Sequence, residues 1–233
     1  NVSFDNDSSA SRQKRTYFMA YFLSVLIGYA FGCINPAYLL GKAKGHNVKK
    51  EGSGNAGASN AAILLGVRWG VIVALIDIFK AFFSMRIAVA LFPEIPFAPV
   101  CAGSACIMGH LYPVTMRFRG GKGLAALGGV MLAYDWRVFL VMLALGCVLL
   151  LLTHYIAIVT AETAVVFPII LAVVYHDPIT ALIVAFCVPF MLFKHLENFR
   201  RIKAGEELRV NWLWKKNTDD YNLSNEEKDN LNR

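Results

Sequence analysis

Three stretches of the sequence carry residue types that bind phosphate groups. In the first, residues 52–60 read Gly-Ser-Gly-Asn-Ala-Gly-Ala-Ser-Asn and lead into an apolar segment. Glycines let backbone N–H groups converge, and a helix N-terminus attracts negative charge, so this pattern suits an anion. The same residues also fit a flexible loop in which Ser59 or Asn60 caps the helix. The candidate anion-binding residues are Gly52, Ser53, Gly54, Asn55 and Asn60.

The second stretch, residues 110–123, joins a histidine to a Gly-Gly-Lys-Gly turn. Arginines stand just before the turn and an apolar segment follows it. The Gly-x4-Gly-Lys-Ser/Thr spacing of a Walker A loop is missing, but the turn still offers N–H groups and cations to a phosphate. His110 alone also fits a hydrogen-bonded structural residue. The candidates are His110, Arg119, Gly121, Lys122 and Gly123.

The third stretch, residues 194–207, follows the last apolar segment directly and is rich in cations. His195 and Asn198 are three positions apart, so they share a face if this part is helical. Arg201 belongs to the same stretch. A basic cap that binds lipid headgroups is the competing interpretation. Such a cap does not need a histidine and an asparagine on one face.

Asp77 and Lys80 lie inside an apolar segment. A charged residue near the middle of a membrane costs about 2.5–3.5 kcal/mol on insertion scales, so such residues are usually paired within the protein. The spacing of three predicts an ion pair, and Lys80 is also a candidate for holding an anionic substrate.

Several common catalytic motifs are missing from the sequence. No histidine is followed five positions later by aspartate, and no Asp-rich, His-Glu-x-x-His or Gly-x-Ser-x-Gly motif occurs. Metal-dependent transfer and hydrolysis by a serine triad therefore lose support. We expect neither a metal nor a cofactor.

Composition indicates the kind of molecule that positions these residues. The chain has 233 residues, of which 57% are hydrophobic and 17% are charged, against roughly 25% charged in soluble domains. The apolar residues form long blocks, which excludes a soluble enzyme, a disordered chain and a disulfide-rich secreted domain. The cations interrupt apolar runs, so the net charge of +7 indicates a membrane and not a nucleic acid.

The apolar blocks predict an all-α, polytopic integral membrane bundle of about seven transmembrane helices. A span needs about 20 apolar residues. Residues 1–16 are expected to form a polar N-terminal tail, residues 17–207 the membrane domain and residues 208–233 a polar C-terminal tail. The predicted spans are residues 17–41, 69–92, 97–116, a tight hairpin of two spans within 123–153, 156–175 and 179–193.

The distribution of cations predicts the orientation of the bundle. With seven spans, the loops at residues 42–61, 117–122 and 194–216 share one side, and most of the Lys and Arg residues outside the spans lie there. The positive-inside rule places that side in the cytoplasm, with the N-terminus outside and the C-terminus inside. The basic residues 12–15 oppose this orientation, but three loops outweigh one tail.

The three stretches, in this order and spacing, resemble the motifs of the PlsY family of bacterial membrane acyl-phosphate:glycerol-3-phosphate acyltransferases. The likeness covers about residues 18–207 and includes residues 52–60, Gly109-His110 with the Gly120–Gly123 turn, and His195-x2-Asn198-x2-Arg201-x3-Gly205-x-Glu207. The resemblance implies a seven-helix bundle in the bacterial plasma membrane, an active site facing the cytoplasm, and no metal. It implies acyl transfer from acyl phosphate to the 1-hydroxyl of glycerol 3-phosphate, giving lysophosphatidic acid and phosphate in phospholipid synthesis.

The resemblance also suggests roles for individual residues. The loop of Ser53 and Asn55 and the turn at Gly121–Gly123 are expected to hold the two phosphates. His195 is the first choice for deprotonating the hydroxyl, with Asn198 orienting the substrate, and His110 is the second. The leaving phosphate could also serve as its own base. Membrane lipid is an expected partner, and a monomer and a homodimer both fit the sequence.

The chain departs from the family pattern at several positions, which keeps other functions open. Ile63 stands where the family has arginine, a change that would remove a charge-assisted bond of about 1.5–3 kcal/mol. Ala157, Thr160 and Cys33 stand in place of serines, and Ser59 in place of threonine. The alternatives are an acyltransferase with a different phosphorylated acceptor, a transporter, or an inactive homologue that binds lipid or phosphate. A transporter should place its polar residues near the membrane midplane, whereas these cluster in loops on one side.

Overall fold

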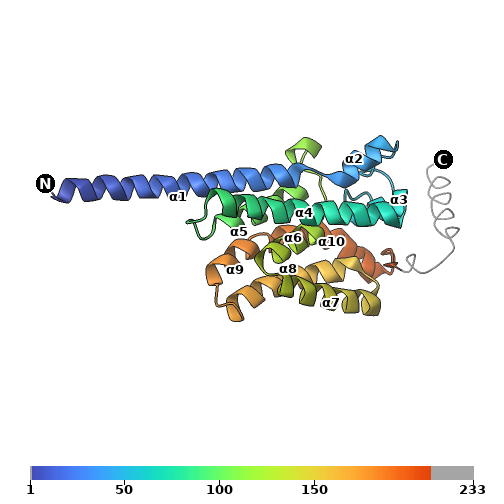
Figure 1. The fold of residues 1–233 in the computed structure, drawn as a ribbon. Helices are drawn as coiled ribbons and strands as arrows, with labels where there is room; N and C mark the ends of the chain where they lie inside the picture. The colour runs from blue at the N-terminus through green and yellow to red at the C-terminus, as the bar shows by residue number, and fades with distance from the viewer. Residues whose placement is uncertain (1, 211–233) are drawn as a thin grey trace.

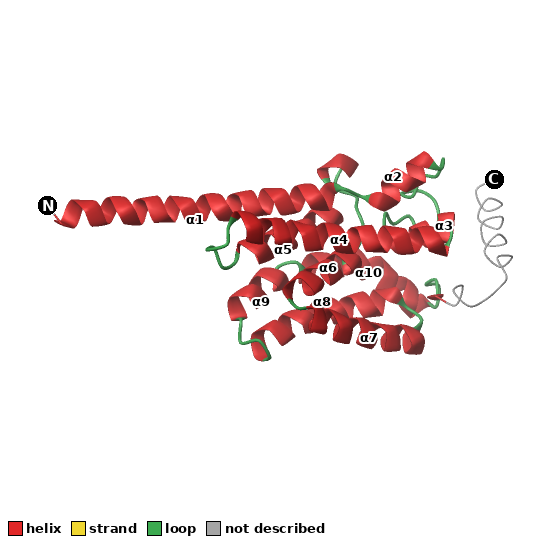
Figure 2. Ribbon diagram, viewed as in Figure 1, coloured by secondary structure: helices red, strands yellow, loops and turns green. Residues whose placement is uncertain are grey.

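The structure, a computed structural model, describes residues 2–210, and this part of the chain consists of helices joined by loops (Figures 1 and 2). The all-α class predicted from the sequence is confirmed for these residues. The helices are α1 (Val2–Cys33), α2 (Pro36–Ala43), α3 (Ala58–Leu65), α4 (Val67–Leu91), α5 (Ala98–Leu111), the 3₁₀ helix η1 (Val114–Met116), α6 (Leu124–Tyr134), α7 (Trp136–Thr153), α8 (Ile156–Val173), α9 (Pro178–Ala185) and α10 (Val188–Ala204).

Helix α1 runs along α5, and its N-terminal part projects beyond the bundle (Figure 1). Residues 2–16, expected as a polar tail, are part of this helix. Small residues allow the close approach of α1 and α5. A Cβ on Gly28 would lie 1.9 Å from the carbonyl oxygen of Ala102, and one on Gly109 would lie 2.4 Å from that of Tyr29. Backbone contact of this kind is typical of helix pairs in membranes.

The first predicted span, residues 17–41, is divided between two helices. Helix α1 ends at Cys33, and α2 begins at Pro36. The side chain of Asn35 caps α2 by accepting a hydrogen bond from the N–H of Tyr38 at 2.8 Å. Proline fits the first position of a helix because that residue needs no N–H donor. The stretch is long and apolar enough to cross a membrane, as predicted. The break within it was not predicted, because hydropathy does not register a cap.

Residues 123–153 were predicted to form a tight hairpin of two spans, and the structure divides them into two helices, of which only α7 is long and apolar enough to cross a membrane. Helices α6 and α7 meet at Asp135, whose carboxylate accepts a hydrogen bond from the N–H of Arg137 at 2.8 Å and caps α7. The hydroxyl of Tyr175 donates to the same carboxylate at 2.7 Å, which ties the hairpin to the segment that follows α8. Helix α6 has only 11 residues, so it is shorter than a full membrane crossing.

The last predicted span also differs from the structure. Residues 179–193 are divided between α9 and α10, and α10 continues to Ala204. Residues 194–204 are therefore helical, although the sequence assigned them to a loop. The helix ends at Gly205, which adopts the left-handed conformation that favours glycine (φ +76°). His195 and Asn198 consequently lie on a rigid element.

Four helical stretches of the described chain are long and apolar enough to cross a membrane: Ser11–Ala43, Trp136–Thr153, Ile156–Val173 and Pro178–Ala204. Many large apolar side chains on the outer surface are exposed, as expected of helices that face lipid. The interior holds a core between α5, α6, α8 and α10 that includes Ile107, Leu127, Phe167, Leu171 and Met191. Helices α2 and α3 and the C-terminal end of α10 lie at the end of the bundle opposite the N-terminus of α1 (Figure 1).

Candidate active site

A cavity of about 370 Å³ brings the three predicted stretches together. It lies between helices α3, α4, α6, α7, α8 and α10. Polar side chains reach it from the loop before α3, from the end of α5, from the turn before α6 and from α10. These residues are Ser53, Asn55, His110, Lys122, His195 and Asn198, with Glu207 just beyond the end of α10. Asp77 of α4, Ser59 of α3, and Thr160 and Thr163 of α8 also line the cavity.

The loop before α3 is held in shape by Asn60. The carbonyl oxygen of its side chain accepts the N–H of Ser53 at 2.7 Å, and its amide donates to the carbonyl oxygens of Val48 and Glu51 at 2.9 and 3.1 Å. A Cβ on Gly52 would lie 2.2 Å from that side-chain oxygen, and Gly52 has a positive φ of 59°. Asn60 is fully buried and does not line the cavity. Of the predicted anion-binding residues in this loop, Ser53 and Asn55 line the cavity, whereas Gly52, Gly54 and Asn60 shape the loop around them.

Helix α3 begins with Ala58 beside the cavity. Its N-cap is Gly57, which offers no side-chain cap. The alternative in which Ser59 or Asn60 caps this helix was therefore wrong. Gly57, Ala58 and Ser59 line the cavity, so the first turn of α3 faces it. The unpaired N–H groups of a first turn are suited to an anion.

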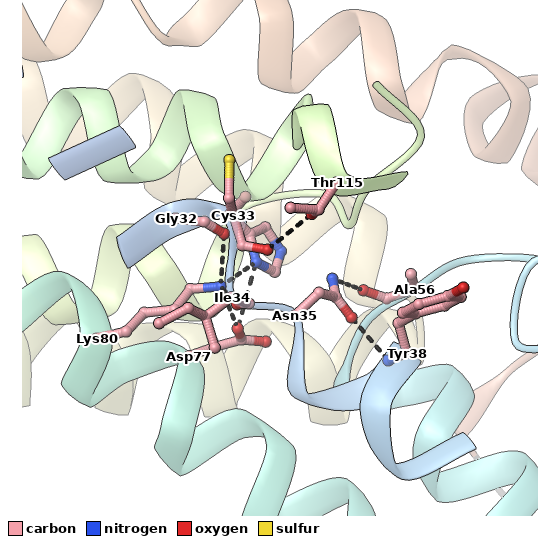
Figure 3. Close-up of polar contacts among 10 residues, drawn as sticks. Gly32, Cys33, Ile34, Asn35, Tyr38, Ala56, Asp77, Lys80 and Thr115 are labelled. Atoms are coloured by element: carbon pink, nitrogen blue, oxygen red, sulfur yellow. Dashed lines mark hydrogen bonds and ion pairs between the residues drawn. The ribbon is translucent and has the colours of Figure 1, made fainter. Parts of the chain in front are cut away.

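Lys80 lies outside the cavity and is part of a buried ion pair. Its ammonium nitrogen is 2.7 Å from the Oδ1 atom of Asp77, and it donates to the carbonyl oxygens of Gly32 and Ile34 at 3.2 and 2.7 Å (Figure 3). These are the carbonyls that the break between α1 and α2 leaves without a helical partner. Lys80 thus stabilises that break, and the predicted ion pair with Asp77 is confirmed. Lys80 does not line the cavity.

His110 lies beside this ion pair and, like Asp77, lines the cavity. Its Nδ1 atom lies 3.0 Å from the Lys80 ammonium and 3.3 Å from the Asp77 carboxylate, and its ring lines the cavity. The turn before α6 lies against the same ring. The N–H of Gly121 donates to the carbonyl oxygen of His110 at 3.0 Å, and a Cβ on Gly121 would lie 2.2 Å from the Nε2 atom. Gly121 is therefore a packing residue behind His110, whereas Lys122 and Gly123 line the cavity.

A chain of polar contacts joins Lys122 to the third stretch. The ammonium of Lys122 donates to the side-chain oxygen of Asn198, and the amide of Asn198 donates to Glu207 at 2.6 Å. Arg201 donates to the other oxygen of Glu207 at 2.7 Å. Burial lowers the pKa of Lys122 to about 8, although the Glu207 carboxylate partly opposes this shift. Asn198 is thus held in one orientation by a cation and an anion.

The ring of His195 is buried. Its hydrogen-bond partner determines which of its two nitrogen atoms carries the proton. The Nδ1 atom lies 2.8 Å from the carbonyl oxygen of Met191. A carbonyl only accepts hydrogen bonds, so Nδ1 carries the proton and Nε2 of the neutral ring keeps its lone pair. Because His195 lines the cavity, it is placed to accept a proton there.

The remaining predicted residues do not reach the cavity. Arg119 is exposed on the loop before Gly120, and Arg201 is half-buried against Glu207. Sequence reasoning noted Glu207 within the third stretch but assigned it no role. Its charge alone does not single it out, because Glu197 and Glu206 lie in the same stretch; the available signal was its place in the spaced pattern that ends the third stretch.

The rest of the cavity is mostly apolar. Helix α6 contributes Leu124, Ala125, Gly128 and Met131, and α7 contributes a face that repeats every three or four residues. Those residues of α7 are Phe139, Met142, Leu143, Gly146, Cys147 and Leu150. Ile63 lines the cavity as well, and so do Ala157 and Thr160 of α8. The arrangement gives a polar region suited to an anion, continuous with an apolar one.

Within residues 2–210, no group of three or more His, Cys, Asp or Glu side chains is arranged to hold a metal ion. The groups that line the cavity are the Lys122 ammonium, amides, hydroxyl groups, two imidazole rings and the carboxylates of Asp77 and Glu207.

Comparison with known proteins identifies relatives over most of the chain. The family model for glycerol-3-phosphate acyltransferase matches residues 22–205. Glycerol-3-phosphate acyltransferase 1 of Oceanobacillus iheyensis is 37% identical over 205 residues, which cover 85% of this chain and 99% of the relative. The glycerol-3-phosphate acyltransferase of Bacillus subtilis is 32% identical over 192 residues, 82% of this chain and 98% of the relative.

Two solved structures have a similar fold. Both are of PlsY, an integral membrane glycerol 3-phosphate acyltransferase, and both are 30% identical to this chain. The glycerol 3-phosphate form has a TM-score of 0.76 and covers 84% of this chain and 99% of its own. The lysophosphatidic acid form has a TM-score of 0.73 and covers 81% and 94%.

Proposed function

The chain belongs to the glycerol-3-phosphate acyltransferase family, and we propose that it transfers a fatty acyl group from acyl phosphate to the 1-hydroxyl of glycerol 3-phosphate. The products are lysophosphatidic acid and inorganic phosphate. The observation that carries this proposal is a cavity in which groups suited to an anion adjoin an apolar region. That combination suits two phosphorylated ligands, one of which has a hydrocarbon tail.

The phosphates are assigned to the polar region. Ser53, Asn55 and the first turn of α3 supply neutral donors, and Lys122 supplies a positive charge. Preorganised donors and a cation stabilise the negative charge that develops on the carbonyl oxygen and on the leaving phosphate. Gly52, Gly54, Asn60 and Gly121 support this arrangement by shaping the loops. Arg119 and Arg201 lie outside the cavity and act on an anion at longer range.

The reaction proceeds in one displacement. The 1-hydroxyl oxygen attacks the acyl carbonyl carbon, its proton passes to Nε2 of His195, and the carbon–oxygen bond to phosphate breaks. Asn198 orients the acceptor, since its amide is fixed between Lys122 and Glu207. Acyl phosphate is already activated, so no covalent enzyme intermediate is required. His110 is the second candidate base, and the leaving phosphate is the third.

The proposed setting is a bacterial plasma membrane crossed about seven times. Helix α1 with α2, helices α4 to α8, and helix α9 with α10 are assigned as the spans. The N-terminus lies outside and the C-terminus inside, so the cavity opens to the cytoplasm. The excess of Lys and Arg in residues 42–61, 117–122 and 194–216 supports this orientation.

Ile63 favours a second candidate, transfer to a different phosphorylated acceptor. This apolar side chain lines the cavity together with Ser53 and Asn55, so the polar region has fewer cations than the family pattern provides. An acceptor with a more apolar body would fit such a wall better than glycerol 3-phosphate does.

Acyl transfer by the purified protein tests the proposal. The protein in detergent receives palmitoyl phosphate and radiolabelled glycerol 3-phosphate, with Ser53→Ala as the loss-of-function variant and Asn47→Ala as a control on the surface of the preceding loop. Labelled lysophosphatidic acid that is lost in Ser53→Ala supports the function. Acyl transfer to another phosphorylated alcohol, without transfer to glycerol 3-phosphate, supports the second candidate. Activity in detergent also excludes a transport cycle that needs a gradient.

A further inference from the structure

Two adjacent glycines in α6 face different surroundings. A Cβ on Gly129 would lie 2.0 Å from the carbonyl oxygen of Ile78, so glycine is required there for α4 and α6 to pack closely. A Cβ on Gly128 would lie 3.5 Å from Cε2 of Phe139 and 3.8 Å from Cγ1 of Ile78. These are ordinary contact distances, which an alanine would accept.

Packing therefore does not explain Gly128. A glycine inside a helix costs roughly 0.5–1 kcal/mol relative to alanine, and at Gly128 no neighbouring backbone demands it. The two atoms nearest to the missing side chain belong to residues that line the cavity on either side, Ile78 from α4 and Phe139 from α7. Because residue 128 has no side chain, the apolar part of the cavity has additional space at this position.

The position of Gly128 along the cavity relates this space to the length of an acyl chain. Leu124, Gly128 and Met131 lie on one face of α6 and all line the cavity, which places Gly128 between its polar region and Met131. Gly128 is about 7.5 Å along the helix from Gly123, at 1.5 Å per residue. An extended chain advances about 1.2 Å per bond, since a polypeptide residue of three bonds spans about 3.5 Å. A four-carbon acyl chain would end before Gly128, and a long chain would have to pass it.

We propose that Gly128 determines which acyl phosphates the protein accepts, by leaving open the passage between Ile78 and Phe139 through which a long acyl chain extends. The inference rests on the proposed function, because it assigns the apolar part of the same cavity to the acyl donor. A side chain at position 128 narrows the passage at the point that the acyl chain reaches after its first few carbon atoms. It leaves the groups that hold the phosphates unchanged.

The test compares palmitoyl phosphate with butyryl phosphate as donors for purified wild type, Gly128→Ala and Gly128→Leu. We expect Gly128→Leu to lower kcat/KM for palmitoyl phosphate by about tenfold or more, as a steric mismatch in an apolar pocket does. Gly128→Ala should show a smaller decrease, and it keeps the test valid if the leucine variant folds poorly. Ala144→Leu adds bulk to an exposed position of α7 that does not line the cavity. It should leave both donors within about twofold of wild type.

A second substitution makes the steric explanation specific. Phe139→Ala removes the ring nearest to the new side chain, so the double variant Gly128→Leu/Phe139→Ala should recover most of the palmitoyl activity that Gly128→Leu loses. An equal loss for both donors, or no recovery in the double variant, overturns the role of Gly128. A wild-type protein that acylates glycerol 3-phosphate from neither donor overturns the proposed function itself. The two failures are therefore distinct.

Discussion

At the scale of single residues, His195 is buried, lines the cavity and has an Nε2 atom that keeps its lone pair in the neutral ring. The Met191 carbonyl fixes its tautomer, so a substitution removes a positioned base without breaking an ion pair. We expect His195→Ala to lower kcat by about 10²–10⁴-fold, the usual contribution of a general base. The measurement is the initial rate of acyl transfer with saturating substrates. His176→Asn, at the opposite end of the bundle, serves as the matched histidine control. A kcat within a few-fold of wild type would assign the proton to His110 or to the leaving phosphate.

Lys122 gives a prediction about pH, because burial lowers its pKa to about 8. The Lys122 side chain is a cation below that pH and neutral above it. In the free enzyme, the positive charge of Lys122 is therefore lost as the pH rises. We expect kcat/KM for glycerol 3-phosphate to fall as the pH increases from 7 to 9. Lys122→Arg keeps a guanidinium whose pKa exceeds about 12, so its activity, whatever its absolute level, should not fall over this range. The same decline in the arginine variant would show that another group titrates.

Lys80 and Glu207 show what residue types alone leave undecided. Both are charged and both belong to motif-like patterns, but Lys80 binds backbone carbonyls at the break in α1–α2, whereas Glu207 reaches the cavity. The sequence does not distinguish a cation that binds an anionic substrate from a cation that binds the carbonyl groups at a helix end. Three-dimensional contacts separate the two roles.

At the scale of elements, the loop before α3 depends on one buried side chain. Asn60→Ala would leave the N–H of Ser53 and the carbonyls of Val48 and Glu51 without their side-chain partners. A buried polar group without a partner costs about 1–3 kcal/mol, so we expect both a lower melting temperature and a higher KM for glycerol 3-phosphate. Asn47→Ala removes an exposed asparagine whose side chain accepts one exposed hydrogen bond, from the N–H of Lys49 at 3.2 Å, so it should change both values much less. A variant with normal KM would mean that Ser53 does not need this loop geometry.

The helices were predictable where hydropathy changes along the chain and less so where it does not. The turn at Asp135 interrupts an apolar run with polar residues, and the α6–α7 hairpin followed from it. The break at Asn35 lies within a continuous apolar stretch, and only the Asn-Pro pair marks it. The end of α10 was placed too early because the sequence becomes basic after residue 193. A change from apolar to basic residues marks the end of an apolar surface, but it does not end a helix. Convergence of the three stretches was predictable because their order and spacing match a family.

At the scale of the whole molecule, the polar groups of the cavity come from segments far apart in the chain. Ser53, Lys122 and Asn198 are brought together because the helices before and after them alternate in direction through the bundle. The apolar region then lies between α4, α6, α7 and α8, within the part of the bundle that faces lipid. An enzyme that joins a soluble phosphate to a hydrocarbon chain needs both regions, and an active site at one end of the bundle provides them.

This geometry is productive only if the end of the bundle that carries α2 and α3 faces the cytoplasm. Single cysteines in a variant without the five native ones can test that orientation. Glu94→Cys lies in the exposed turn between α4 and α5, and Lys50→Cys lies in the exposed loop before α3. In intact cells we expect an impermeant maleimide to label Glu94→Cys, and to label Lys50→Cys only after the membrane is permeabilised. One span, α4, separates these two loops and places them on opposite sides of the membrane. The reverse labelling pattern would therefore show that the whole bundle has the opposite orientation. It would place the cavity on the side away from cytoplasmic glycerol 3-phosphate, and labelling of both sites in intact cells would contradict α4 as a span.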